Sequence, residues 1–212
     1  MSESRRLPVY LLLDCSGSMN GEPIEAVRAG VKALIADLKT DPQALETAYM
    51  SVITFAGSAQ QVAPLTELMM FQEPHLDASG STSLGEALTQ LEQCVDREVK
   101  KSTPTQKGDW KPLVFLMTDG QPTDSWEQAA DRIKQKRINI IACAAGPGAD
   151  ANLLKRITEE VVILNNLQPD TLKAFFKWVS SSIKMTSQSI QQVGPDTPVS
   201  LPPPPPTIQF VP

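Results

Sequence analysis

The sequence has few of the residues that build zinc sites or disulfide frameworks. Its 212 residues include a single histidine, His75, and three cysteines, Cys15, Cys94 and Cys143, which form no CxxC pair. An odd number of widely spaced cysteines fits neither a zinc site nor a disulfide framework. Free thiols are typical of a reducing compartment, so we place the protein in the cytoplasm.

Long apolar runs and basic clusters are also missing. The first apolar stretch, residues 7–13, ends at Asp14 and is too short for the hydrophobic region of a signal peptide or for a membrane span. Acidic residues outnumber basic ones by 24 to 19, the net charge is -5, and lysine and arginine do not cluster on one face. We therefore expect neither nucleic acid nor a membrane as a partner.

What is present is a regular alternation of strand-like and helix-like segments. Apolar runs typical of buried strands are separated by helical patterns and occupy residues 9–13, 49–55, 113–117, 138–142 and 161–164. A turn at Gly57 and Ser58 should return residues 61–65 antiparallel to the second run. The alternation predicts an α/β, Rossmann-like fold: a doubly wound, mostly parallel six-stranded sheet with one antiparallel edge strand and helices on both faces.

The composition changes near the end of the chain. After Thr186 it shifts to serine, glutamine and proline, with an unbroken proline run at residues 202–206. We expect a domain at residues 1–187, with its last helix ending near residue 185, and a proline-rich tail at residues 188–212. The tail should adopt polyproline II, either as a spacer or as a ligand for a groove. Residues 207–211 alternate like a strand, which fits docking on this domain or on a second chain.

Polar residues gather where three predicted strands end or the adjoining loops begin. Asp14, Ser16 and Ser18 follow the first strand, Thr82 lies in a Gly-Ser-Thr-Ser segment before a helix, and Asp119 follows a later strand. Loops at the carboxyl edge of such a sheet can converge on one ligand. Two carboxylates and three hydroxyls suit Mg²⁺, Mn²⁺ or Ca²⁺ better than softer metals, and Mg²⁺ fits best.

These residues resemble the von Willebrand factor A domain family with its metal-ion-dependent adhesion site. The family's DxSxS motif is present at residues 14–18, its threonine as Thr82, and its second aspartate as Asp119. The resemblance covers residues 7 to about 185. It implies that Ser16 and Ser18 bind the metal directly, that Asp14, Thr82 and Asp119 bind directly or through water, and that an Asp or Glu of a partner protein completes the shell.

Within that family, the chain is similar to the TerY-type proteins of bacterial tellurite-resistance gene clusters. The similarity rests on overall length, on residues 11–19 (LLLDCSGSM) and on residues 116–124 (LMTDGQPTD). It implies a cytoplasmic scaffold in the tellurite and stress response, working with other Ter proteins or with a kinase and phosphatase pair.

Three functions compete at this point. The first is a non-enzymatic, metal-dependent interaction module, because neither main motif contains a histidine or lysine as a general base. The alternative is a Mg²⁺-dependent phosphoryl-transfer enzyme of haloacid-dehalogenase type with Asp14 as nucleophile, although Ser16 stands where that group needs a second aspartate. The third is a scaffold whose metal only ties loops together.

Smaller features receive plainer interpretations. We expect Ser83 and Glu86 to form a capping box at the start of one helix, and Asp124 or Ser125 to cap the next. Cys15 should be a packed small side chain rather than a reactive thiol.

Overall fold

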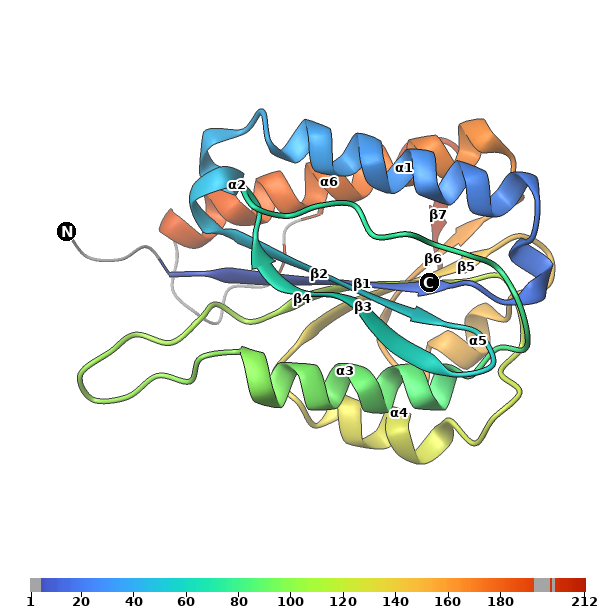
Figure 1. Cartoon of the computed structure of the whole chain (residues 1–212), viewed down its shortest axis with the longest axis horizontal. Helices are drawn as coiled ribbons and strands as arrows, with labels where there is room; N and C mark the ends of the chain where they lie inside the picture. Colours follow the sequence, from blue (N-terminus) through green and yellow to red (C-terminus); the bar gives the residue numbers. More distant parts are fainter. Residues whose placement is uncertain (1–4, 193–198, 200) are drawn as a thin grey trace.

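The fold is an open seven-stranded sheet with helices on both faces (Figure 1). The computed structural model describes residues 5–192, 199 and 201–212. The strands are β1 (Leu7–Asp14), β2 (Ala48–Phe55), β3 (Ala59–Glu67), β4 (Leu113–Thr118), β5 (Asn139–Ala145), β6 (Glu160–Leu164) and β7 (Ile208–Phe210). The helices are η1 (Gly17–Met19), α1 (Glu22–Leu38), α2 (Pro42–Thr47), α3 (Leu84–Glu98), α4 (Glu127–Lys134), α5 (Ala151–Leu154) and α6 (Pro169–Gln192).

The sheet has the order β3-β2-β1-β4-β5-β6-β7. The five inner strands are parallel to one another, whereas β3 and β7 pair antiparallel at the two edges. This confirms the predicted α/β class and the antiparallel return after the turn at Gly57. The number of strands is seven rather than six, because residues 208–210 of the C-terminal segment add β7 to the edge of β6.

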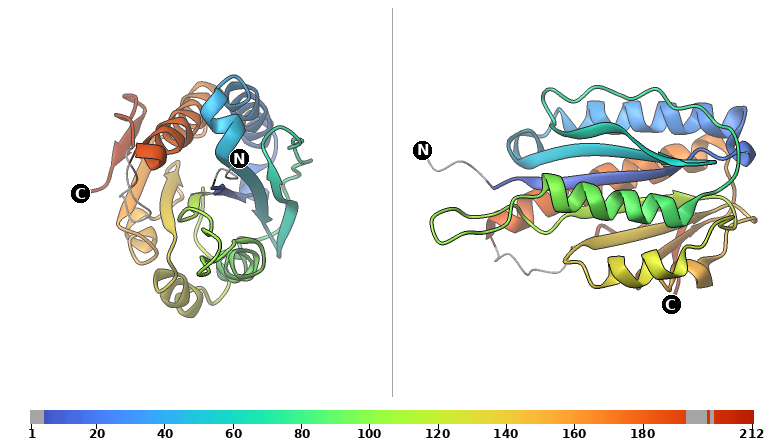
Figure 2. Two further views of the ribbon diagram at one scale, coloured as in Figure 1. Left: turned by 90° about the vertical axis from the view of Figure 1, so that its left-hand side faces the viewer. Right: turned by 60° about the horizontal axis from the view of Figure 1, so that its bottom comes forward.

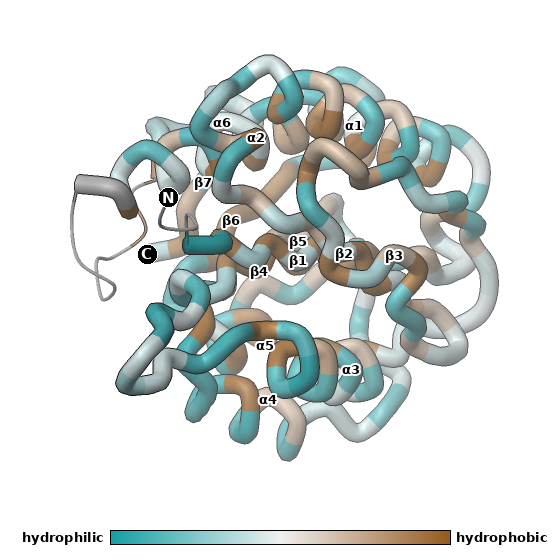
Figure 3. The backbone as a smooth tube through the Cα atoms, turned by 60° about the vertical axis from the view of Figure 1, so that its left-hand side comes forward, coloured by the Kyte–Doolittle hydropathy of each residue, from teal (hydrophilic) through white to brown (hydrophobic). Residues whose placement is uncertain are grey.

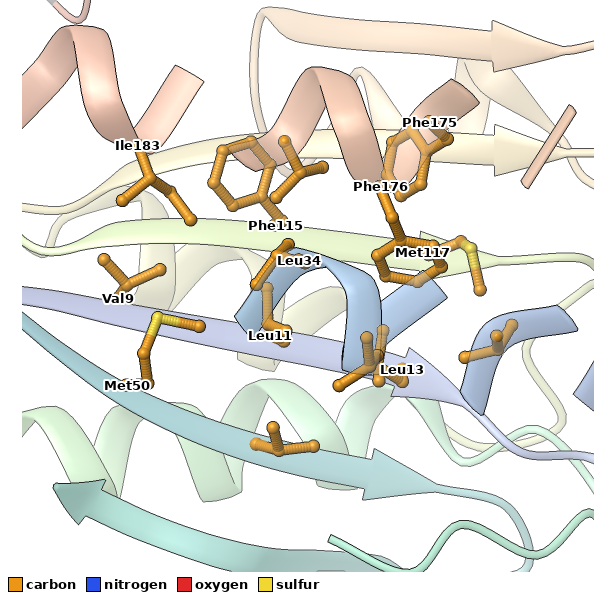
Figure 4. Close-up of a cluster of buried hydrophobic side chains, with 14 of the residues drawn as sticks. Val9, Leu11, Leu13, Leu34, Met50, Phe115, Met117, Phe175, Phe176 and Ile183 are labelled. Atoms are coloured by element: carbon orange, nitrogen blue, oxygen red, sulfur yellow. The ribbon is translucent and has the colours of Figure 1, made fainter. Parts of the chain in front are cut away.

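Two apolar cores lie on opposite faces of the sheet because successive strand residues point to opposite sides. Val9, Leu11 and Leu13 of β1 face α1 and α6, as Figure 4 shows. Tyr10 and Leu12 belong to the second core, beneath α3, α4 and α5. Figure 2 shows the helices separated into these two layers, and in Figure 3 the inner strands are mostly hydrophobic. Every residue of β1 and β4 is buried, as expected for inner parallel strands.

The last helix is longer than its sequence pattern predicts. It continues to Gln192, so residue 187, the predicted domain boundary, lies inside α6. Serine and threonine hydroxyls in this part of the helix bond back to carbonyls one turn earlier: Ser182 Oγ to Trp178 O, and Thr186 Oγ1 to Ser182 O, both at 2.8 Å. These bonds satisfy two polar side chains that would otherwise be buried unpaired, whereas the buried Ser187 Oγ in the same stretch has no hydrogen-bond partner among the described residues.

Candidate metal centre

Asp14 is held at both carboxylate oxygens where β1 ends. Its Oδ1 accepts a bond from the Ser16 backbone N at 2.9 Å, and its Oδ2 accepts one from Thr118 Oγ1 at 2.6 Å. The side chain is fully buried. Thr118 is the last residue of β4, which runs parallel beside β1, so the sheet brings the two together. Thr118 directly precedes Asp119 in the sequence, but no local sequence pattern indicates that its hydroxyl positions Asp14.

Ser16, Ser18 and Asp119 form a tight group of oxygens. Ser16 Oγ and Ser18 Oγ are 3.0 Å apart, and Asp119 Oδ1 accepts from Ser18 Oγ at 3.0 Å and from Ser16 Oγ at 3.5 Å. Ser16 and Asp119 are buried, whereas Ser18 is exposed. The group is therefore accessible from solvent on the side of Ser18.

The electrostatics of this group favour a bound cation. Burial raises the pKa of the Asp119 carboxyl above its ordinary value, and the nearby Asp14 charge raises it further, while hydrogen bonds from Ser18 and Ser16 oppose the shift. The ionised carboxylate is thus destabilised by desolvation and by a second negative charge. A divalent cation between the two carboxylates would remove that penalty.

Thr82 lies at the same edge of the sheet, in a loop whose backbone bonds to the segments that follow β1 and β2. Gly17 N donates to Gly80 O at 2.9 Å, Ser79 N to Cys15 O at 2.8 Å, and Ser83 N to Ala56 O at 2.8 Å. A Cβ built at Gly120 would lie 3.7 Å from Thr82 Oγ1, which places this hydroxyl beside the turn that carries Asp119. Thr82 itself is buried.

Gly80 is required by the geometry of that loop. Its φ is +74°, and a Cβ there would lie 3.0 Å from the backbone N of Gly57. A residue with a side chain would meet both a disfavoured backbone conformation and a backbone atom that has little freedom to move.

The helix caps near the site differ from those expected. Ser83 makes no side-chain cap bond, and the Glu86 carboxylate instead accepts from Ala59 N at 3.1 Å, so the capping box is wrong. Asp124 caps α3 rather than α4: its two oxygens accept from Gly85 N at 3.0 Å and from Glu86 N at 2.9 Å. Helix α4 begins after Trp126 without a side-chain cap bond.

Thr123 joins the Asp119 loop to Thr82. Thr82 N donates to Thr123 Oγ1 at 3.2 Å, and Thr123 N donates to Thr82 O at 2.9 Å. Together with the Asp124 cap, these bonds fix the position of Thr82 relative to Asp119. Sequence patterns missed both roles because each joins residues about forty positions apart.

The residues fit a hard divalent ion by the chemistry of their donors. The structure brings all five expected residues, Asp14, Ser16, Ser18, Thr82 and Asp119, to one edge of the sheet through the bonds described above. Within residues 5–192, 199 and 201–212, no three histidine, cysteine, aspartate or glutamate side chains gather in a metal-binding arrangement. A metal at this edge would therefore depend on hydroxyl oxygens, which favours hard ions over soft ones.

Cys15 lies between the ligand positions but belongs to the core. It is 2% exposed and packs with the residues between the sheet and α1. Burial raises the pKa of its thiol to about 12. A thiol with this pKa carries almost no thiolate at neutral pH, in agreement with a packing role.

Comparison with known proteins identifies the family. Residues 9–177 match the model of the von Willebrand factor type A domain, and the chain belongs to this family. Domains of this family are typically metal-dependent adhesion or interaction modules. A protein of Synechocystis sp. described as uncharacterized is 34% identical over 125 residues, covering 55% of this chain and 26% of that protein.

Solved structures agree on the fold. A von Willebrand factor type A structure from Catenulispora acidiphila has a TM-score of 0.66 at 21% identity, with 86% of this chain and 43% of that chain covered. Proximal thread matrix protein 1 from the mussel byssus, with a zinc-occupied MIDAS motif, has a TM-score of 0.61 at 18% identity, with coverage of 86% and 48%. The manganese-loaded TRAP protein of Plasmodium vivax has a TM-score of 0.55 at 19% identity, with coverage of 80% and 71%.

These comparisons bound what is known of the whole protein. The chain spans about a quarter of the Synechocystis relative and less than half of the Catenulispora and mussel chains. The family model and the solved structures reported above do not support the haloacid-dehalogenase alternative. Among the described residues, no helix combines the length and apolarity needed to cross a bilayer.

Proposed function

We propose that this chain is a non-enzymatic protein-interaction domain that binds Mg²⁺ through Asp14, Ser16, Ser18, Thr82 and Asp119. The observation that carries the proposal is the convergence of Ser16, Ser18 and Asp119 within 3.0–3.5 Å of one another, with Ser18 exposed. When bound, the ion would supply an electrophilic centre for a carboxylate of the partner.

The charge balance of the site supports recognition of an acidic residue. Two carboxylates offset the charge of a divalent ion, while three neutral hydroxyls add coordination without further negative charge. The ion therefore stays attractive to one more carboxylate. Because Ser18 is exposed and the remaining four residues are buried, the partner would approach on the side of Ser18.

A polar hollow at the start of α3, the helix that follows Thr82, offers room for the residues that flank that carboxylate. Its volume is about 470 Å³, and it lies between α3 and α4. Gly85 and Asp124 line the hollow, together with Gln90, Gln128 and Arg132. We propose that a partner bound at the metal makes hydrogen bonds to these amide and guanidinium groups.

Serine substitutions test the metal site. Ser18→Ala should abolish Mg²⁺ binding measured by calorimetry, and should abolish the Mn²⁺ signal change measured by electron paramagnetic resonance. The control is Ser58→Ala, which removes the hydroxyl of an exposed serine on the neighbouring β2–β3 turn. Equal metal affinity in both variants would contradict the proposed ligand set.

Partner capture tests the interaction. A partner retained in Mg²⁺ should be lost in EDTA and lost with Ser18→Ala, while Ser58→Ala retains it. Binding that is unchanged in EDTA would contradict metal-bridged recognition. A metal that raises thermal stability without any partner depending on it would point to the structural role instead. Asp14-dependent turnover of an aryl phosphate would contradict the non-enzymatic assignment.

We further propose that the domain acts as a cytoplasmic scaffold in bacterial tellurite resistance and stress response. The support is the similarity of residues 11–19 and 116–124 to TerY-type proteins. On this proposal the partners are other Ter proteins or a kinase and phosphatase pair. Metal-dependent co-purification with such proteins is the expected result, and a deletion strain with unchanged tellurite tolerance would contradict it.

A further inference from the structure

The C-terminal segment 201–211 covers the β6 edge of the sheet and part of α6 (Figure 2). Ile208, Gln209 and Phe210 pair antiparallel with Leu164, Ile163 and Val162, and Val211 N donates to Val161 O at 2.9 Å. Ile208 is 2% exposed, whereas Phe210 is 40% exposed. The short strand is therefore held by backbone bonds and one fully buried side chain.

Trp178 of α6 contacts both parts of this segment. Its indole Nε1 donates to the carbonyl of Pro202 at 3.0 Å, and its ring meets Phe210 edge-to-face with centroids 6.0 Å apart. The other side of the indole belongs to the core, where Phe115 lies 6.5 Å away in the same arrangement. Trp178 is 3% exposed with the segment docked, and its ring also contacts Phe115 and Phe175 of the core.

This combination of contacts is how proteins recognise extended peptides. A proline-rich stretch has no internal hydrogen bonds and presents free carbonyls, which aromatic residues with an N–H group bind. A strand added to a sheet edge supplies main-chain hydrogen bonds, with a pocket for alternate side chains. Here both modes act on one continuous segment, with the proline run at Trp178 and the strand on β6.

We propose that the β6 edge and Trp178 form a recognition surface for this segment, and that the surface accepts the segment from a second copy of the chain as well as from its own. Every contact described above joins the segment to a residue at or before Trp178. Another copy can therefore make the same contacts, as in exchange of an identical element between protomers. The attached segment competes through its high effective concentration, so it blocks the surface in the isolated chain. This inference does not depend on the metal site.

The first experiment releases the attached segment within the full-length chain. Ile208→Asp/Phe210→Asp places two charges where apolar side chains pack, and should undock the segment. Gln209→Asp is the matched control, because Gln209 is exposed on the same strand. Hydrogen exchange at the Val211 amide, which donates to Val161 O of β6, reports release. Continued protection in the double variant would overturn the proposal, because Ile208 and Phe210 would then not hold the segment.

The second measurement adds a fluorescent synthetic peptide of residues 201–212 as the probe. The released variant should bind it at least roughly tenfold more tightly than the wild-type chain or Gln209→Asp, since its surface is free. Adding Trp178→Phe, which keeps an aromatic ring but removes the N–H donor, should weaken that binding roughly threefold to tenfold. Absence of binding to the released variant, or equal binding to all chains, would overturn the proposal.

Mixing two defective copies tests exchange between whole chains. The released variant keeps the surface and loses the segment, whereas Trp178→Phe in the otherwise native chain keeps the segment and weakens the surface. Sedimentation should show a one-to-one dimer in the mixture and monomers in each separate sample at the same total concentration. Because the Trp178→Phe chain can still hold its own segment, the mixture is measured up to about 1 mM, the order of the effective concentration of an attached segment. A mixture that stays monomeric at that concentration refutes exchange between copies.

Discussion

The loop edge that carries the candidate metal centre and the strand edge that carries β7 are held together in different ways. At the loop edge, several backbone bonds join neighbouring segments, as in those from Cys15 N to Phe55 O and from Gly17 N to Gly80 O. At the β7 edge, a three-residue strand depends on Ile208 and on Trp178. The loop edge is therefore fixed by several independent backbone bonds, whereas the β7 edge is held by few contacts.

This difference matters for function. A metal site needs its ligands fixed within a fraction of an ångström before the ion arrives, so dense backbone bonding suits it. A segment that exchanges with another copy needs to leave without unfolding the domain, so a small number of separable contacts suits it. The predictions below separate the two edges by damaging one at a time.

The largest effect is expected from Gly80→Ala at the loop edge. The added Cβ would lie 3.0 Å from Gly57 N, in a backbone conformation with φ of +74°. We expect a loss of roughly 1–3 kcal/mol in the free energy of unfolding and a roughly tenfold or greater loss of Mg²⁺ affinity, because the loop also carries Thr82. Denaturant unfolding and calorimetry measure the two quantities.

Gly21→Ala provides the matched control for that substitution. Gly21 has φ of +83°, but a Cβ there has no atom within 4 Å. Its φ is positive like that of Gly80, but the contact is missing. We expect it to lower stability less and to leave Mg²⁺ affinity unchanged. Equal loss of affinity in both variants would show that strain alone, rather than the contact with Gly57, disturbs the site.

A smaller effect is expected from Ile208→Asp at the β7 edge. The buried charge should undock the segment, and the loss is limited to the burial of one isoleucine and its neighbours, about 2 kcal/mol. Mg²⁺ affinity should stay at the wild-type value because the loop edge shares none of these contacts. A parallel loss of metal binding would mean that the two edges are coupled, which contradicts their separation.

Asp124→Ala should have a weaker effect on stability but a clear one on the metal. It removes the acceptor for Gly85 N and Glu86 N, which costs about 1 kcal/mol for a helix cap. The neighbouring Thr123 then holds Thr82 less firmly, so Mg²⁺ affinity should fall roughly tenfold. Asp124→Asn keeps one acceptor oxygen and should retain part of the stability and part of the Mg²⁺ affinity. Full affinity in Asp124→Ala would show that the cap does not support Thr82.

The sequence predicts the parts of this molecule that local spacing encodes. Asp14, Ser16 and Ser18 lie on one turn after an apolar strand, and strand ends that share an edge bring Asp119 near them. The α/β alternation likewise follows from local patterns. Thr82 could be expected at the site because its segment opens the helix after the β2–β3 hairpin.

Features that depend on distant contacts could not be predicted in this way. Asp124 lies three residues before the start of α4, yet its carboxylate caps α3, because the fold brings the two helix starts together. The alternating pattern of strand β7 fits docking on this domain or on a second chain. Its pairing with β6 depends on the packing of Trp178 and Ile208, which the pattern does not encode. Helix α6 continues to Gln192 through a polar stretch in which a hydroxyl bonds within the helix, Ser189 Oγ to Met185 O, and the composition alone does not reveal this.

The smallest effect is expected at Asp37, which joins α1 to α6 away from both edges. Its carboxylate accepts from Lys184 at 2.8 Å and from Ser180 Oγ at 2.5 Å, and these bonds lower the pKa of Asp37 below its ordinary value. A lowered folded-state pKa stabilises the protein above the unfolded-state pKa of about 4, and the contribution is lost as pH falls through the folded-state value.

Asp37→Asn should therefore reduce the free energy of unfolding near neutral pH by about 0.2–1 kcal/mol, since the pair is partly exposed and screened by solvent. The difference from wild type should shrink as the pH falls below about 4 and vanish once Asp37 is protonated in both states. Denaturant unfolding between neutral and acidic pH measures this difference in the free energy of unfolding. The control is Asp131→Asn, which changes an exposed aspartate on α4. A difference that grows on acidification would contradict the direction of the pKa shift. Mg²⁺ affinity and peptide binding should be unchanged, because Asp37 contacts neither the loop edge nor segment 201–211.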